Sequence, residues 1–150
     1  MDITERFMTA ALVQARLAAA LEEVPVGAVI IKDNEIIAAD HNRCETNKDA
    51  TAHAEILVIQ KASALLGGWR LSGCSLYVTL EPCAMCAGAM VQSRLEKLSF
   101  GAYDPKAGAA GSLFNIVEDT RLNHQLEVFG GILAEECADL LKQFFAGRRR

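Results

Sequence analysis

The segment Cys74–Leu80, with the sequence CSLYVTL, is a continuous run of apolar and β-prone residues. A short run of this kind is typical of a strand that lies inside a sheet and is covered on both faces. Helical spacing precedes it at Ala52–Leu66 and follows it from Pro82 to about Gln92. Strands that alternate with helices indicate an α/β fold. We therefore expect an α/β/α sandwich of three layers.

The other segments fit this architecture. Thr4–Leu21 is alanine-rich, with apolar residues at helical spacing, and predicts an amphipathic helix that Pro25 interrupts. The runs VGAVIIK and EIIAADH flank Asp33-Asn34, a turn signal, and predict a hairpin that makes the sheet mixed. The further expected elements are a strand at Leu95–Ala102, a short helix or turn near Leu113–Val117, a weak strand around Gln125–Phe129 and a final helix with Cys137, Leu140, Leu141 and Phe144 on one face.

Length and composition favour a single domain over residues 1–150, without repeats or linkers. No run approaches the roughly 18 uncharged apolar residues of a membrane span. The N-terminus lacks a basic stretch followed by an apolar one, which favours the cytoplasm. The five cysteines are an odd number, which argues against a disulfide framework and leaves thiols available to a metal.

The formal net charge of −4 argues against indiscriminate nucleic-acid binding, although an acidic body can carry a local basic patch. Arg148–Arg150 at the C-terminus is the candidate for such a patch. These three cations could be a solvated helix end or could contact phosphate groups. The sequence leaves both interpretations open.

Two motifs carry the chemistry. His53 opens one predicted helix, and Cys83 and Cys86 lie three residues apart at the start of another. Cysteines at this spacing are neighbours on a helix surface, and a helix N-terminus favours the thiolate form. Three ligands of this kind suit Zn²⁺, and three protein ligands leave a position for water, as in catalytic zinc sites.

Glu55 follows the histidine by two residues, on the apolar stripe that continues with Val58, Ala62 and Leu65. A buried carboxylate is costly without a partner, and beside an activated water it could transfer protons. The cysteines alone would equally fit core thiols or a redox pair. The conjunction of H-x-E with P-C-x-x-C, each opening a helix, favours metal catalysis, and it is the known signature of the zinc-dependent base deaminases.

The chain closely resembles the bacterial tRNA-specific adenosine deaminases (the TadA family) over nearly its full length. The matching stretches are EVPVGAV (Glu23–Val29), TAHAEI (Thr51–Ile56), LYVTLEPCAMCAGAM (Leu76–Met90), GAAGSLFN (Gly108–Asn115), LNH (Leu122–His124) and the late Phe144-Phe145. The zinc motifs are shared by the whole deaminase superfamily, whereas the other stretches indicate this branch.

The resemblance implies a cytidine-deaminase-like sandwich around a five-stranded mixed sheet, assembled as a homodimer with one Zn²⁺ per subunit. The implied reaction converts the wobble adenosine of a tRNA anticodon stem-loop, mainly that of an arginine tRNA, to inosine. By this match His53, Cys83 and Cys86 bind zinc and Glu55 shuttles protons. By the same match, Val26 and Asn42 would contact the flipped base. The residues near the flanking nucleotides would be Asp104, Lys106 and Asn123.

Two positions depart from the family pattern: Ala50 stands where proline is usual before TAHAE, and Gln125 stands where arginine is usual after LNH. Two other functions stay open. One is the deamination of a free base or nucleoside, such as guanine or cytosine, on the same fold. The other is a non-catalytic RNA-binding module stabilised by zinc, in which a buried proton shuttle would have no use. The helix of PCAMCAGAM is apolar nearly all round, which predicts that both of its faces are buried. The resemblance implies that one of them lies against a second subunit.

Overall fold

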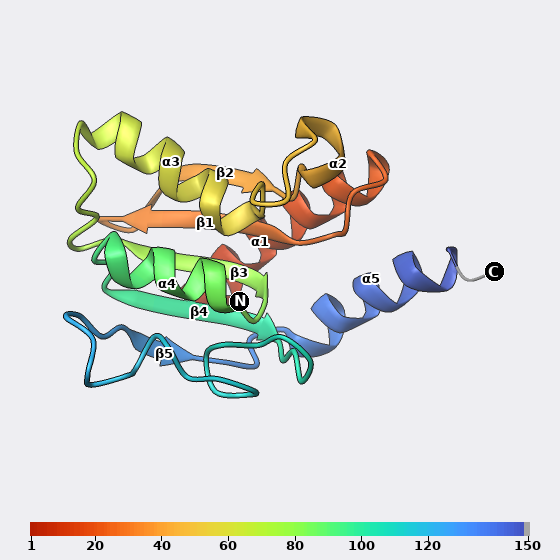
Figure 1. The fold of residues 1–150 in the computed structure, drawn as a ribbon. Coiled ribbons are helices and arrows are strands. Elements are labelled where there is room, and N and C mark those ends of the chain that lie inside the picture. Colours follow the sequence, from red (N-terminus) through yellow and green to blue (C-terminus); the bar gives the residue numbers. More distant parts are fainter. Residues whose placement is uncertain (149–150) are drawn as a thin grey trace.

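The computed structural model describes residues 1–148 (Figure 1). The predicted helices and strands occur in the predicted order, and the short helix α2 is an addition to them. Their bounds are α1 (Ile3–Ala20), β1 (Gly27–Lys32), β2 (Glu35–His41), α2 (Cys44–Asn47), α3 (Ala54–Leu66), β3 (Ser75–Leu80), α4 (Ala84–Gln92), β4 (Lys97–Ala102), β5 (Glu127–Phe129) and α5 (Ala134–Ala146).

The five strands form one mixed sheet in the order β2-β1-β3-β4-β5. Strand β1 runs antiparallel to both β2 and β3, whereas β3, β4 and β5 are parallel to one another. The run CSLYVTL supplies β3, the middle strand, which confirms the predicted central position. A parallel pair needs a crossover connection, and α4 provides it between β3 and β4.

Helices cover both faces of the sheet, as expected. On one face, α3 and α4 lie side by side and share the main core with the strands (Figure 1). On the other face, α1 packs across β1, β2 and β3, and α5 packs on β4 and β3. The resulting three-layer sandwich confirms the predicted fold class.

Local chemistry sets the helix and turn boundaries. Asp2 accepts a hydrogen bond from the Glu5 N–H and so caps the start of α1. Asp33 and Asn34 both have positive φ values, 52° and 62°, as a two-residue type I′ hairpin turn requires. Helix α3 ends at Gly67, whose φ of +74° is the left-handed conformation common after a helix.

One local expectation was wrong. Leu65 does not continue the buried stripe of Glu55, Val58 and Ala62, because it lies in the last turn of α3 and is 63% exposed. Of the short helix or turn expected near Leu113–Val117, the structure has the turn, closed by an isolated β-bridge between Ala110 and Asn115. None of the helices described in residues 1–148 is long and apolar enough to cross a membrane.

Helix α1 approaches the sheet most closely at Gly27, the first residue of β1. A Cβ atom at this position would lie 2.0 Å from the Ala11 carbonyl oxygen and 2.5 Å from the Ala15 nitrogen. These are backbone atoms of α1, so the helix itself would have to move to admit a side chain.

Gly27→Ala should therefore lower the free energy of unfolding by about 2 kcal/mol or more, which is typical of overpacking. Urea unfolding monitored by circular dichroism measures the change. The matched control is Gly68→Ala, since nothing lies within 4 Å of a Cβ there, and it should change stability by less than about 0.5 kcal/mol. Equal unfolding midpoints for the two variants would contradict the tight contact between α1 and β1.

Candidate functional site

The starts of α3 and α4 converge beside the end of β3. His53 and Cys83 are the N-cap residues of these helices, one position before the first turn in which the sequence analysis placed them. Both have extended backbone, and neither side chain caps its own helix. The two side chains are therefore free to bind a ligand between the helices.

His53, Cys83 and Cys86 form one cluster, as predicted. The His53 Nδ1 atom lies 3.6 Å from the Cys83 Sγ and 3.5 Å from the Cys86 Sγ. The three donor atoms all lie within 4.8 Å of one another. Cys86 is buried, and the other two residues are half-buried. The cluster can hold a metal ion through one nitrogen and two sulfur atoms.

The two thiols differ in acidity. Hydrogen bonds from Cys86 and His53 lower the pKa of Cys83 to about 3. The pKa of Cys86 is raised, first because its thiol is the donor to Cys83 and second because it is buried. The hydrogen bond with Cys83 also raises the pKa of His53. The lowered pKa of Cys83 favours its thiolate, which is the form of cysteine that binds metals.

Glu55, in the first turn of α3, is buried and only 4% exposed. Burial raises its pKa to about 7, whereas the nearby His53 opposes this rise. The carboxyl group lies close enough to the cluster to interact with both Cys83 and Cys86. A group with this pKa can both accept and release a proton near neutral pH.

A cavity of about 260 Å³ opens over this cluster. It brings together most of the residues singled out in the sequence. The lining residues are Val24, Val26, Asn42, Cys44, His53, Glu55, Leu80, Glu81, Cys83, Asp104 and Ala107.

Lys106 is exposed on the loop that carries Asp104, and its backbone N–H donates to the Asp104 carboxylate. Asn123 lies apart from this cavity, in a separate hollow along α4 that includes Gly88 and Arg94. Gln125 closes its own loop, because its amide donates to the carbonyl oxygens of Asp119 and Leu122.

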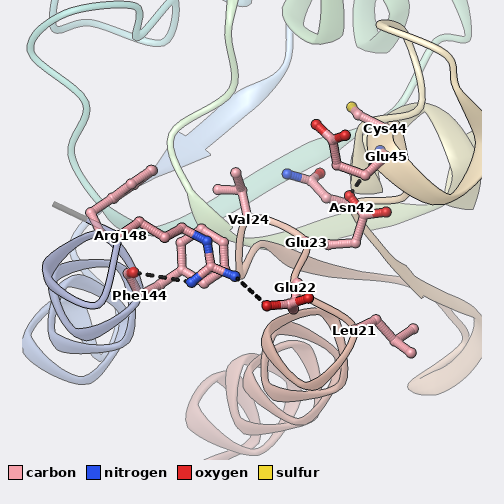
Figure 2. Close-up of a pocket in the computed structure, with 10 residues that line it drawn as sticks. Leu21, Glu22, Glu23, Val24, Asn42, Cys44, Glu45, Phe144 and Arg148 are labelled. Atoms are coloured by element: carbon pink, nitrogen blue, oxygen red, sulfur yellow. Dashed lines mark hydrogen bonds and ion pairs between the residues drawn. The ribbon is translucent and has the colours of Figure 1, made fainter. Parts of the chain in front are cut away.

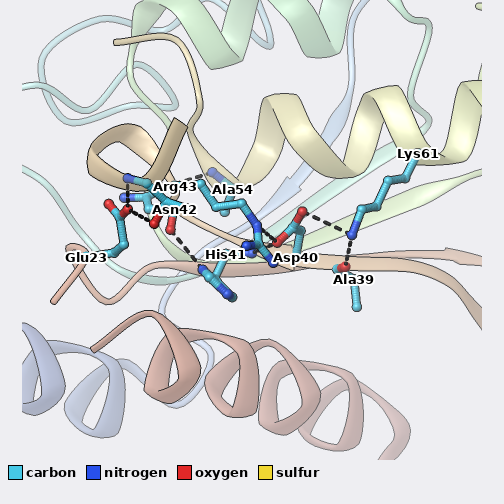
Figure 3. Close-up of polar contacts among 9 residues, drawn as sticks. Glu23, Ala39, Asp40, His41, Asn42, Arg43, Ala54 and Lys61 are labelled. Carbon is cyan, nitrogen blue, oxygen red and sulfur yellow. Dashed lines mark hydrogen bonds and ion pairs between the residues drawn. The ribbon is translucent and has the colours of Figure 1, made fainter. Parts of the chain in front are cut away.

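Asn42 connects the cavity to the start of α3 (Figure 3). Its side-chain oxygen accepts a hydrogen bond of 2.8 Å from the Ala54 N–H, one of the unpaired donors at the helix start. That bond fixes the orientation of the amide, so the NH₂ group is left for a ligand in the cavity. The adjacent Asp40 is buried and pairs with Arg43 and Lys61, which anchors this end of β2.

A larger hollow of about 570 Å³ adjoins the cavity and shares Val24, Asn42 and Cys44 with it (Figure 2). The end of α5 forms its far wall. There the Arg148 guanidinium lies 3.5 Å from the centre of the Phe144 ring and 3.7 Å from the Glu22 carboxylate. Arg149 and Arg150, the rest of the predicted basic tail, lie outside the described residues.

Sequence patterns did not reveal two buried carboxylates: Glu81, which lines the cavity, and Glu23, which lines the adjoining larger hollow. Glu23 accepts hydrogen bonds from the N–H groups of Glu45 and Thr46, at the short helix α2. Glu81 binds the loop that follows β4. In the sequence, such a buried carboxylate is indicated by a charged residue among apolar ones, as in TLEPC.

Comparison with known proteins identifies deaminases as relatives of this chain. The family model for MafB19-like deaminases matches residues 2–149. The tRNA-specific adenosine deaminase of Bacillus subtilis is 52% identical over 146 residues, which cover 97% of this chain and 91% of the relative. That of Haemophilus influenzae is 47% identical over 149 residues, covering 99% of this chain and 86% of the relative.

Solved structures of deaminases have the same fold as this chain. A structure from a study of A-to-I editing by tRNA:A34 deaminases superposes with a TM-score of 0.88 at 46% identity, covering 91% of this chain and 99% of that one. A guanine deaminase from Nitrosomonas europaea gives 0.82 at 26% identity, covering 95% and 84%. The chain therefore belongs to the MafB19-like deaminase family, among the bacterial tRNA-specific adenosine deaminases.

Proposed function

We propose that the protein hydrolyses the C6 amino group of the wobble adenosine in a tRNA anticodon, with an arginine tRNA as the main substrate and inosine as the product. The observation that carries this proposal is the position of Glu55. A buried carboxyl group lies in the same cavity as the His53, Cys83 and Cys86 cluster. A purely structural metal site has no need of such a group.

The cluster fits Zn²⁺. Tetrahedral zinc, with bonds of about 2.3 Å to sulfur and about 2.0 Å to nitrogen, places the sulfur and nitrogen ligands about 3.5 Å apart. The distances from His53 Nδ1 to the two sulfur atoms are 3.6 and 3.5 Å. His53, Cys83 and Cys86 would hold the ion and leave one position open. Zinc, when bound, would supply water acidic enough to provide a nucleophile near neutral pH.

Glu55 would move the protons of the reaction. As a carboxylate it accepts a proton from the attacking water, and as the acid it protonates the ring nitrogen beside C6. It then takes the remaining proton from the hydroxyl group now bonded to C6 and delivers it to the amine, which leaves as ammonia. The pKa of about 7 supports this exchange, because both forms of the group are accessible at neutral pH.

The other predicted residues would bind the substrate. The free NH₂ group of Asn42 would donate to an acceptor atom of the flipped adenine, and Val26 would supply an apolar wall. Asp104 and Lys106, on one loop beside the cavity, would lie near flanking nucleotides. Asn123 would contact RNA at a separate place along α4.

An RNA substrate is favoured over a free base because the cavity is continuous with the larger hollow beside Arg148. That hollow offers room for nucleotides next to the flipped base, and Arg148, which pairs with Glu22, lies on its wall. The relatives with 44–52% identity are tRNA-specific adenosine deaminases, whereas the guanine deaminase is 26% identical. A tRNA substrate would also place the protein in the cytoplasm.

Glu55→Gln should lower kcat/KM on an anticodon stem-loop roughly a thousandfold while the metal content stays near one ion per chain. The reason is that the amide keeps the shape of the side chain but cannot accept and return a proton. Inosine is quantified by mass spectrometry of digested RNA, with free adenosine, guanine and cytosine tested in parallel.

Glu35→Gln is the matched control. Glu35 is exposed at the start of β2, whereas Asn42, which lines the cavity, follows the other end of that strand. It should leave turnover unchanged. Activity of Glu55→Gln close to that of the unaltered protein would remove Glu55 from the reaction. Deamination of a free base with no inosine in RNA would replace the proposed substrate.

We also propose a homodimer that buries the outer face of α4. Ala87 and Met90 point into the chain's own core, whereas Met85 is exposed and Gly88 and Ala89 are partly exposed. The apolar outer face therefore lacks a covering element within residues 1–148. A second copy of the chain, placed against this helix, would bury it.

Gly88→Lys should convert the dimer to a monomer of 16.2 kDa, which light scattering coupled to gel filtration measures. Nothing lies within 4 Å of a Cβ at Gly88, so the single chain can accept the side chain without unfolding. Val13→Lys, on the exposed side of α1, is the control and should stay dimeric. A monomeric unaltered protein at micromolar concentration would overturn the dimer.

A further inference from the structure

Glu81 is the last residue before the Pro82-Cys83 segment, and its buried carboxylate collects hydrogen bonds from a distant loop. One oxygen accepts from the Asp104 N–H at 3.0 Å and from the Ser112 hydroxyl. The other accepts from the N–H groups of Ala110 and Ser112 at 3.1 and 3.0 Å. Four donors from residues 104–112 thus converge on one side chain.

No lysine or arginine within residues 1–148 forms an ion pair with Glu81. Its charge is instead stabilised by the loop itself, since a buried carboxylate needs hydrogen bonds to offset its lost hydration. The loop makes one other hydrogen bond to the segment before α4, from the Ala109 N–H to the Pro82 carbonyl oxygen. Its remaining backbone hydrogen bonds lie within residues 104–116, and Ala109 and Ala110 pack in the main core. The carboxylate is therefore the main polar anchor of this loop.

The loop packs directly onto that anchor. A Cβ atom at Gly108 would lie 2.4 Å from the carboxyl carbon of Glu81 and 2.5 Å from the Asp104 carbonyl oxygen. Only glycine lets the backbone of the loop approach the carboxylate this closely. The anchored loop supplies Asp104 and Ala107 to the wall of the cavity above the cluster.

We propose that Glu81 is a positioning residue: it holds residues 104–112 as one wall of the cavity and thereby sets the place of Asp104 against the RNA. This inference rests on the proposed function, because its kinetic effect is measured on an RNA substrate. Glu81 binds the loop after β4. Glu55 and Cys86, by contrast, lie on α3 and α4, and His53 lies at the start of α3. Loss of the anchor should therefore weaken substrate binding more than it slows the chemical step.

Glu81→Gln is the central variant. The amide has one acceptor oxygen, and its NH₂ group would face donors of the loop, so part of the anchor is lost. KM for the anticodon stem-loop should rise roughly ten- to a hundredfold, with kcat changed less than about threefold. The metal content should stay equal to that of the unaltered protein, which shows that Cys83 is undisturbed.

Limited proteolysis reports on the loop without any substrate. Lys106 is the single lysine or arginine between positions 104 and 112, so trypsin can cut this loop only there. Glu81→Gln should speed cleavage after Lys106 roughly tenfold or more, because a released loop reaches the protease more often. Asp119→Asn is the control: it removes a carboxylate that holds the Arg121 N–H of another turn, and it should leave Lys106 cleavage unchanged.

Two further variants keep the test valid if Glu81→Gln fails to fold. Ser112→Ala removes one of the four donors and should give the same changes at smaller size. Gly108→Ala keeps the carboxylate but pushes the loop away from it, and should resemble Glu81→Gln. In the double variant Glu81→Gln/Gly108→Ala the two increases in KM should be less than multiplicative, because both act on one contact.

Unchanged KM and unchanged cleavage after Lys106 in these variants would overturn the proposal. A parallel loss of bound metal and of kcat in Glu81→Gln would also overturn it, because Glu81 would then act by positioning Cys83 instead of the loop. If the unaltered protein forms no inosine, the proposed function fails. The cleavage assay then still decides whether Glu81 holds the loop.

Discussion

Two helices that begin at the same place beside the sheet determine what this protein can do. Helices α3 and α4 start next to the end of β3, and their N-cap residues are His53 and Cys83. Because neither side chain caps its own helix, both are available, together with Cys86, to bind a common ligand. The sheet order and the crossover through α4 matter for function mainly because they produce this convergence.

The buried carboxylates that line the cavity and the adjoining hollow fall into two kinds. Glu81 and Glu23 accept several hydrogen bonds from nearby loops, which lower their pKa values despite burial. Glu55 is buried with much less compensation, and its pKa rises to about 7. Satisfied carboxylates hold the walls of the cavity in place, whereas the poorly satisfied one is suited to exchange protons. Burial alone would not have distinguished these roles.

The metal cluster and the order of the elements were predictable because periodicity and short motifs are local properties of the sequence. Other features depend on contacts that no local pattern encodes. Glu81 binds residues 23 to 31 positions away, and the exposure of Leu65 depends on where α3 extends past its neighbours. Likewise the hydrogen bond from the Ala54 N–H to the Asn42 side chain, 12 residues earlier, joins the end of β2 to the start of α3.

We propose that His53, Cys83 and Cys86 together hold one zinc ion in the cavity that contains Glu55. Diffraction data collected on both sides of the zinc absorption edge, from protein never exposed to a chelator, would decide this. We expect one anomalous peak per chain, about 2.3 Å from both sulfur atoms and about 2.0 Å from His53 Nδ1. A disulfide between Cys83 and Cys86 with no anomalous peak would contradict it.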